Sequence, residues 1–400
     1  MTLRGVAAKR VVTCDPARPG ALGVVDDGAV VFDGDRIAYV GERTGAPHGV
    51  ALDDVGNRVV TPGLVDAHTH ACWVGSRHAE YAARMRGEDY QAIASAGGGI
   101  RATQRAVAAA GTDQLEQALA ARLRRMASLG VTTVEVKSGY GLERTHERKQ
   151  LEAIARVANR SDVPSVVPTL LALHALPDAE RGDRAAYVRR VADELVPEVA
   201  RDRLARFVDA YVDAGAFTVG EARIVGEAAR AAGLGVRLHV GQFADVGGSE
   251  LAASLGAASA DHLEHVSRAG IEALAAANVA AVLLPVASFT LAQAPPPVQA
   301  LRDAGVALVV ASDANPGTAP TESLPLAMAL AVRAYGFSPD EVLIAATRSA
   351  AHALGLDDRG VLREGARADL VAWELPHEQA IAQPWGVSIT RAVIVGGRAI

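Results

Sequence analysis

Short runs of β-forming residues alternate with longer amphipathic stretches through the middle of the chain, and this alternation limits the possible folds more than any other feature. It is typical of βα units, whose strands form a parallel sheet. The expected strands are 64–68, 131–136, 166–172, 206–211, 236–240, 258–262, 280–284 and 306–311. Eight such repeats in roughly 290 residues predict a closed (β/α)₈ barrel.

Five stretches, four between these strands and one after the last, have the apolar spacing of helices that pack one face on a core. They are 115–129, 146–158, 182–198, 218–232 and 322–334. The longest insertion, 72–112, contains Gly97-Gly98-Gly99 and follows the first expected strand. A loop in that place leaves the carboxyl end of the barrel, so we expect the insertion to cover the mouth as a lid.

Both ends of the chain contain short strand-like runs in place of βα units. These runs are 29–32 and 36–40 near the amino terminus, and 368–373 and 393–398 near the carboxyl terminus. Neither end is large enough to bury a good core by itself. We therefore expect residues 1–60 and 360–400 to form one small β-sandwich, and residues 61–359 to form the catalytic barrel.

The composition excludes several classes of protein. The chain is 50% hydrophobic, has a net charge of -6 and contains only 4% aromatic residues, with no block of Lys and Arg. A nucleic-acid partner is therefore not expected. The start of the sequence lacks the continuous apolar segment of a signal peptide, and no uncharged apolar run of about 18 residues occurs. We therefore expect a cytoplasmic protein without a membrane partner. Cys14 and Cys72 are interpreted as small buried thiols.

Polar residues gather at the ends of the expected strands, where barrels of this kind have their active sites. His68 and His70 end the first strand and, being one residue apart, point to the same side of an extended chain. The others are His174, His239, His262 and Asp313, at the ends of strands three, five, six and eight. Five of the 11 histidines thus fall at strand ends, which favours a functional site over scattered structural histidines.

A metal site follows from this placement. Three imidazoles and one carboxylate, from His68, His70, His239 and Asp313, form a ligand set suited to Zn²⁺ or iron, with a position left for water. The fourth strand contains no lysine that could bridge a second metal, so we expect one ion per chain. Lys137, on the second strand, is interpreted as structural.

The motifs around these residues resemble the amidohydrolase superfamily. The superfamily features are Pro62 to His70, His239 and Ser312-Asp313. Finer motifs resemble the imidazolonepropionase family within it: 75–77, 97–100, 135–143, 174–177, 259–263 and 313–318. The resemblance covers residues 60–375, and it is specific because the superfamily at large shares only the metal ligands.

The resemblance implies hydrolysis of the ring amide of 4-imidazolone-5-propanoate to N-formimidoyl-L-glutamate in L-histidine degradation, by a homodimer with one Zn²⁺ or Fe³⁺ per chain. Asp313 would bind the metal and accept the proton of the attacking water, and His262 would hold the water or the developing oxyanion. Arg77 offers a bidentate fork for the substrate propionate. The other substrate-contact candidates are Tyr140, His174, Gln242, Asn315, Gly317, Thr318 and Tyr90.

Gln242 departs from the Glu that some members of this family have three residues after the strand-five histidine. An amide does not transfer protons, so we expect Gln242 to orient the substrate and Asp313 or His262 to perform acid–base work. Gln242 also argues against a purine or pyrimidine deaminase, because the deaminases that this sequence resembles have Glu at this position. Another cyclic amidase remains an alternative function. A non-catalytic assembly protein would lack metal ligands, and all four are present. Glu264 is interpreted as an outer or surface group.

Overall fold

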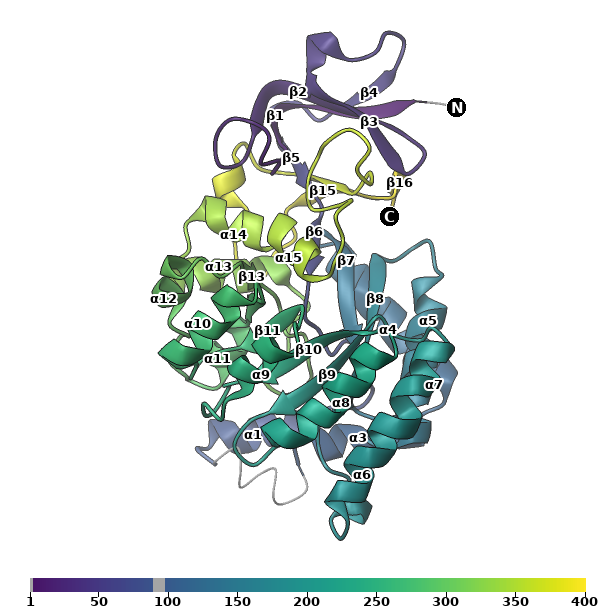
Figure 1. Ribbon diagram of the computed structural model, residues 1–400. Helices are drawn as coiled ribbons and strands as arrows, with labels where there is room; N and C mark the ends of the chain where they lie inside the picture. The colour runs from purple at the N-terminus through teal and green to yellow at the C-terminus, as the bar shows by residue number, and fades with distance from the viewer. Residues whose placement is uncertain (1–2, 89–97) are drawn as a thin grey trace.

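The computed structural model of the chain describes residues 3–88 and 98–400 and contains two eight-stranded sheets (Figure 1). One sheet is the barrel, and each of its strands pairs in parallel with the next in chain order. Its strands are β6 (Leu64–Asp66), β7 (Val131–Lys137), β8 (Ser165–Leu173), β9 (Phe207–Val212), β10 (Gly235–Val240), β11 (Ser259–His262), β12 (Ala280–Leu283) and β13 (Leu308–Val310). All eight predicted strands are therefore confirmed.

The barrel closes between its last and first strands just beyond their carboxyl ends. Backbone N–H of Asp313 donates to His68 O at 3.1 Å, and that of His70 donates to Ala314 O at 3.0 Å. A parallel bridge between Thr69 and Ala314 lies in the same place. Closure thus occurs at the residues predicted to bind the metal.

Helices surround the barrel, and the five predicted ones are confirmed. The α-helices after β6 in the described part of the chain are α1 (His78–Met85), α3 (Ile100–Ala109), α4 (Thr112–Ala127), α5 (Arg144–Ala158), α6 (Arg184–Arg190), α7 (Val196–Arg201), α8 (Val219–Ala231), α9 (Gly248–Ser254), α10 (Arg268–Ala276), α11 (Pro285–Thr290), α12 (Val298–Asp303), α13 (Leu324–Ala334), α14 (Pro339–Ala345) and α15 (Arg348–Ala353). The π-helical turn η3 (Val191–Leu195) joins α6 to α7. In α8 a capping box of Thr218 and Glu221 fixes the first turn. Its buried residues Ala222, Val225 and Ala229 recur at helical spacing, so α8 buries one face.

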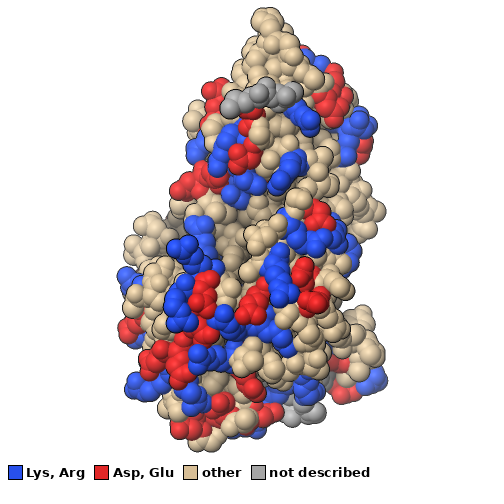
Figure 2. Space-filling view, turned by 90° about the vertical axis from the view of Figure 1, so that its right-hand side faces the viewer, with Lys and Arg blue, Asp and Glu red and all other residues tan. Residues whose placement is uncertain are grey.

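Ion pairs link the outer helices on the side where α5, α6 and α7 lie. Arg144 of α5 lies 2.7 Å from Glu194 of η3, and Arg148 lies 2.6 Å from Glu198 of α7 and from Asp202. Figure 2 views this side of the molecule, and basic and acidic side chains are interspersed over it. Exposed pairs of this kind contribute little to stability individually, so packing of the apolar faces holds these helices.

The insertion after β6 lies at the barrel mouth in the part that the structure describes. Its helices α1 and α3 flank residues 89–97, which lie outside the described residues and include the predicted contact Tyr90. Gly98, Ile100 and Arg101 line the cavity at the mouth. None of the helices within residues 3–88 and 98–400 is long and apolar enough to cross a membrane.

Strands from both ends of the chain pair into the second sheet, as predicted. They are β1 (Arg4–Val12), β2 (Val24–Asp33), β3 (Arg36–Glu42), β4 (Ala51–Asp54), β5 (Val59–Pro62), β14 (Leu370–Trp373), β15 (Thr390–Val395) and β16 (Arg398–Ala399). The antiparallel pairing of β14 with β5 joins the two ends, and hydrogen bonds connect all eight strands in one sheet with its own apolar core. The domain limits at residues 60 and 360 stay a prediction.

Trp373 of β14 connects this sheet to the barrel. The side chain is fully buried in the barrel core, and its Nε1 donates to Thr61 Oγ1 at 2.9 Å. Gly130, with φ +94°, leaves room for the indole, because a Cβ there would lie 2.5 Å from the ring. One large side chain therefore fills the space between β14 and the strand that follows Gly130.

We predict that Trp373→Ala lowers the free energy of unfolding by about 3–5 kcal/mol, because it leaves a large cavity in a close-packed core. Urea unfolding measures the loss. Trp385→Ala is the matched control, since Trp385 is 54% exposed. The control should change stability by less than about 0.5 kcal/mol. Equal effects of the two substitutions would contradict the role of Trp373.

Candidate active site

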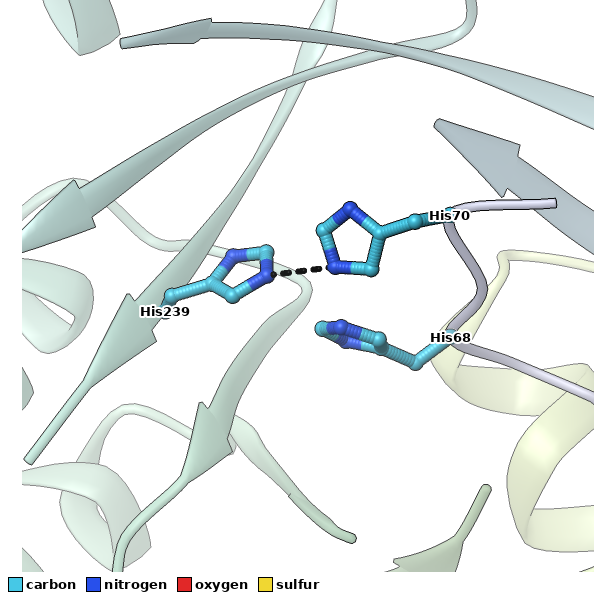
Figure 3. A group of neighbouring side chains, drawn as sticks. All are labelled: His68, His70 and His239. Atoms are coloured by element: carbon cyan, nitrogen blue, oxygen red, sulfur yellow. Dashed lines mark hydrogen bonds between the residues drawn. The ribbon is translucent and has the colours of Figure 1, made fainter. Parts of the chain in front are cut away.

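The four predicted metal ligands meet at the barrel mouth. Figure 3 shows His68 and His70, which follow β6, turned toward His239 of β10. One ring nitrogen of each lies within 4.8 Å of the others, and Nε2 of His70 is 3.3 Å from Nε2 of His239. Asp313 Oδ1 lies 3.5 Å from His68 Nε2 and 3.4 Å from His70 Nε2. The chain thus gathers three imidazoles and one carboxylate around one point.

The protonation of these side chains suits a cation. Burial lowers the pKa of His68, His70 and His239 well below the usual histidine value, so all three are neutral. His68 Nε2 and Asp313 Oδ1 are buried and have no hydrogen-bond partner in the described part of the chain. Leaving such atoms unpaired is costly, and a metal ion at this point would satisfy them together. This group can hold a metal ion.

Two buried carboxylates determine which nitrogens face that point. Asp261 Oδ2 lies 2.6 Å from His68 Nδ1, and Asp209 Oδ1 lies 3.0 Å from His239 Nδ1. A carboxylate in this position accepts a hydrogen bond from Nδ1–H, which leaves the lone pair of Nε2 available to a metal. Neither aspartate was assigned a role from the sequence: Asp209 lies within β9, and Asp261 lies near the end of β11.

Two buried cations balance these carboxylates. Lys137 Nζ donates to Asp209 Oδ2 at 2.8 Å and to Glu135 Oε1 at 3.0 Å. Arg237 Nη2 lies 3.3 Å from Asp261 Oδ2. Burial alone would raise the pKa of Asp261, but Arg237 and Lys137 lower it overall. Lys137 therefore lies behind the ligands, in agreement with its structural interpretation.

A cavity of about 650 Å³ opens at these ligands. Of the predicted site residues that the structure describes, all except His68 and Gly317 line it. Those lining it are His70, Arg77, Tyr140, His174, His239, Gln242, His262, Asp313, Asn315 and Thr318. Small-molecule sites commonly have volumes of about 300–1,000 Å³, so the cavity is of a size for a small substrate.

Arg77 is held from two sides. Its Nε donates to Glu80 Oε2 at 2.8 Å and its Nη2 donates to Glu80 Oε1, while Gly99 N also donates to Glu80 Oε2 at 2.9 Å. A Cβ at Gly317 would lie 2.2 Å from Arg77 Nη1, so only glycine leaves room for the guanidinium. Glu80 was not identified from the sequence, although its position three residues after Arg77, at the start of a helical pattern, was a usable signal.

Tyr140 and His174 form another wall of the cavity. Their ring centroids are 5.4 Å apart, and His174 Nδ1 lies 2.7 Å from Gly139 O. Burial lowers the pKa of His174 to about 4, so its ring is neutral. Buried Glu147 of α5 accepts hydrogen bonds from Gly139 N at 2.8 Å and Leu142 N at 2.6 Å, which fixes the loop that carries Tyr140.

The structure gives Gln242 and Asn315 different tasks. Tyr211 OH donates to Gln242 Oε1 at 3.0 Å, so the amide N–H groups of Gln242 remain to face a hydrogen-bond acceptor in the cavity. Asn315 instead bonds within its own loop: its Oδ1 accepts from Gly317 N at 2.8 Å and Thr318 N at 2.7 Å. Its Nδ2 donates to Asp313 O at 2.7 Å, so Asn315 holds the loop of the metal aspartate.

The amidohydrolase family model matches residues 59–400. A protein of Myxococcus xanthus named imidazolonepropionase is 42% identical, over 100% of this chain and 94% of the relative. A protein of the same name from Acidiphilium cryptum is 44% identical, over 97% of both chains. This chain belongs to the amidohydrolase family. Within the family, its relatives of about this identity carry the name imidazolonepropionase.

A solved structure confirms the fold. A mutant of the atrazine chlorohydrolase of Arthrobacter aurescens, complexed with zinc and atraton, matches with a TM-score of 0.74 at 19% identity. The match covers 99% of this chain and 94% of that structure. At 19% identity, this match is evidence for the fold alone.

We predict that Asp209→Asn weakens zinc binding by about 10- to 100-fold, because His239 loses the carboxylate that fixes its tautomer. Competition with a chelating dye measures the affinity. Asp369→Asn is the control: Asp369 is equally buried and lies 3.2 Å from Arg367, but it belongs to the segment that joins the terminal sheet. Equal loss of affinity in both variants would show that the effect is not local.

Proposed function

We propose that this amidohydrolase opens the ring of 4-imidazolone-5-propanoate to give N-formimidoyl-L-glutamate in L-histidine degradation. The observation that carries the proposal is a group of three histidines and one aspartate at a cavity that also exposes Arg77. The group suits hydrolysis of an amide, and Arg77 suits the carboxylate of the substrate. The relatives' names support the same reaction.

His68, His70, His239 and Asp313 are the residues that would hold one Zn²⁺ or Fe³⁺. Nitrogen and carboxylate ligands accommodate both ions. When bound, the metal supplies Lewis-acid activation of water and of the ring carbonyl.

Asp313 and His262 carry the proton chemistry in this proposal. Burial raises the pKa of Asp313 to about 7, so its carboxylate can accept a proton from the attacking water and return it to the leaving ring nitrogen. Burial opposes a charge on His262, but Glu264 and Asp313 outweigh it and raise the pKa of His262. A protonated His262 can donate a hydrogen bond to the oxyanion that forms when water adds to the carbonyl carbon.

The remaining residues bind and orient the substrate. Arg77, fixed by Glu80, pairs with the propanoate, and Tyr140 and His174 line the wall beside it. Gln242 donates its amide N–H to a ring acceptor, which an imidazolone offers at its carbonyl oxygen and imine nitrogen. The homodimer, the cytoplasmic location and the lack of a nucleic-acid partner stay predictions.

We predict that the purified protein accelerates the ultraviolet decay of freshly prepared 4-imidazolone-5-propanoate, with N-formimidoyl-L-glutamate as the product. Chelation should abolish the decay and readdition of Zn²⁺ or iron should restore it, because the water is activated by the metal. His239→Ala, which removes a ligand, is the inactive control. Absence of decay with folded, metal-loaded protein would overturn the substrate, and other cyclic amides and aminated heterocycles would then be screened.

We predict that Arg77→Ala raises KM for the propanoate substrate by about 10- to 100-fold, because the substrate carboxylate loses a hydrogen-bonded charge pair with the guanidinium. Glu80→Gln should raise KM in the same direction by less, because Arg77 stays but loses its fixed orientation. Turnover of 4-imidazolone without the side chain is the control, and neither substitution should change it. An unchanged KM for Arg77→Ala would remove Arg77 from the carboxylate role.

A further inference from the structure

The turn after β11 brings a further acidic side chain to the site. His262 and Leu263 have φ values of +82° and +72°, a left-handed conformation that costs free energy for residues other than glycine. The turn reverses the chain so that Glu264 lies beside the ring of His262, with Nδ1 and Oε2 3.7 Å apart. Strain of this kind is concentrated at functional sites, so the placement of Glu264 needs an explanation.

Glu264 is held rigidly in this position. Its Oε1 accepts a hydrogen bond from Ser288 Oγ of α11 at 2.6 Å, and Ser288 Oγ lies 2.6 Å from Tyr335 OH. All three side chains are buried. The other carboxylate oxygen, Oε2, has no hydrogen-bond partner in the described part of the chain, and neither has His262 Nδ1. The two unpaired atoms face each other.

The separation of 3.7 Å is an ion-pair distance, slightly too long for a hydrogen bond. Hydrogen bonds of active sites are often long without substrate and shorten in the complex. A small rotation of the ring would pair both atoms at once. No other polar atom of the described residues competes for them by forming a hydrogen bond.

The pair of Glu264 and His262 repeats the arrangement behind the metal ligands, but with a different target. Asp261 and Asp209 orient His68 and His239, whose Nε2 atoms belong to the metal group. The ring of His262 lies 5.5 Å from that of His239, outside this group, and lines the cavity. The nitrogen that Glu264 leaves free on His262 is therefore available to the reacting molecules.

We propose that Glu264 is a positioning residue for the hydrolysis: it keeps the proton of His262 on Nδ1 and turns Nε2 toward the cavity, and Ser288 holds Glu264 in place. Nε2 can then accept a hydrogen bond from the attacking water and, once protonated, donate one to the oxyanion. This role rests on the proposed function. The position of the ring proton can be measured without turnover.

Three variants test the proposal by kinetics in the zinc-loaded protein. Glu264→Gln keeps the shape and one acceptor oxygen of the side chain but removes its charge. Glu264→Leu removes the charge and both acceptor oxygens. Ser288→Ala removes the hydrogen bond that holds the carboxylate of Glu264 in place. We expect kcat to fall by about 10- to 100-fold for Glu264→Leu, as for carboxylates that orient metal-bound histidines, with smaller losses for the other two. KM and zinc content should stay within about twofold of the wild type, because no substrate contact or ligand is removed.

Glu378→Gln is the matched control, since Glu378 is also buried, accepts a hydrogen bond from Arg10 at 2.7 Å and lies beside the terminal sheet. It should leave kcat unchanged. A kcat within about twofold of the wild type for Glu264→Leu would overturn the proposal. If Glu264→Leu does not fold, Glu264→Gln and Ser288→Ala decide by the same criterion.

A second measurement uses ¹⁵N NMR of the histidine rings in zinc-loaded protein without substrate, with the His262 signals assigned from their loss in His262→Asn. We expect Nδ1 of His262 to carry a proton in the wild type, in the neutral ring or in the imidazolium, and a mixture of both neutral forms in Glu264→Leu. A wild-type His262 protonated only on Nε2 would overturn the role of Glu264. Failure of the wild type to hydrolyse the imidazolone would instead overturn the proposed function. The NMR result would still show whether Glu264 sets the position of the ring proton of His262.

Discussion

Closure of the barrel at its mouth is the constraint on which the site depends. Strands β13 and β6 meet through the bonds of Asp313 N to His68 O and His70 N to Ala314 O. Beside them, the buried carboxylate of Asp66 accepts hydrogen bonds from Ser312 N at 3.0 Å and Ser312 Oγ at 2.5 Å. The ligands from the first and last strands therefore come together only when the barrel is complete. Because a bound metal favours the state that holds its ligands, it also stabilises this closure.

Behind the ligands, the chain buries five charged side chains in one network: Glu135, Lys137, Asp209, Arg237 and Asp261. Burying charges is costly, and a buried ion pair is often no more stable than an apolar replacement. The network is better explained by the site. Its carboxylates fix the tautomers of His68 and His239, and its cations, Lys137 and Arg237, offset part of the cost of burying the carboxylates.

The barrel and the clustering of the candidate metal ligands could be predicted because they depend on local patterns. Strands alternate with amphipathic helices at readable spacing, and active sites of such barrels lie at strand ends, which placed His239 beside His68. The partners of the ligands could not be predicted, because they depend on register between strands. His239 bonds to Asp209 of β9, although the register neighbour of Asp209 on β10 is Arg237. Arg237 in turn bonds to Asp261 of β11, although the register neighbour of Asp261 on β10 is His239. Nothing within one strand reveals these pairings.

The carboxylates beside three histidines differ in what balances their charge, and this difference separates metal binding from proton transfer. Lys137 compensates Asp209, and Arg237 compensates Asp261. Glu264 instead bonds to the hydroxyl of Ser288, and no Lys or Arg in the described part of the chain lies within ion-pair distance of it. A compensated carboxylate favours a neutral imidazole, the form that binds metal. An uncompensated one also favours the imidazolium, the form that His262 needs after it has taken up a proton.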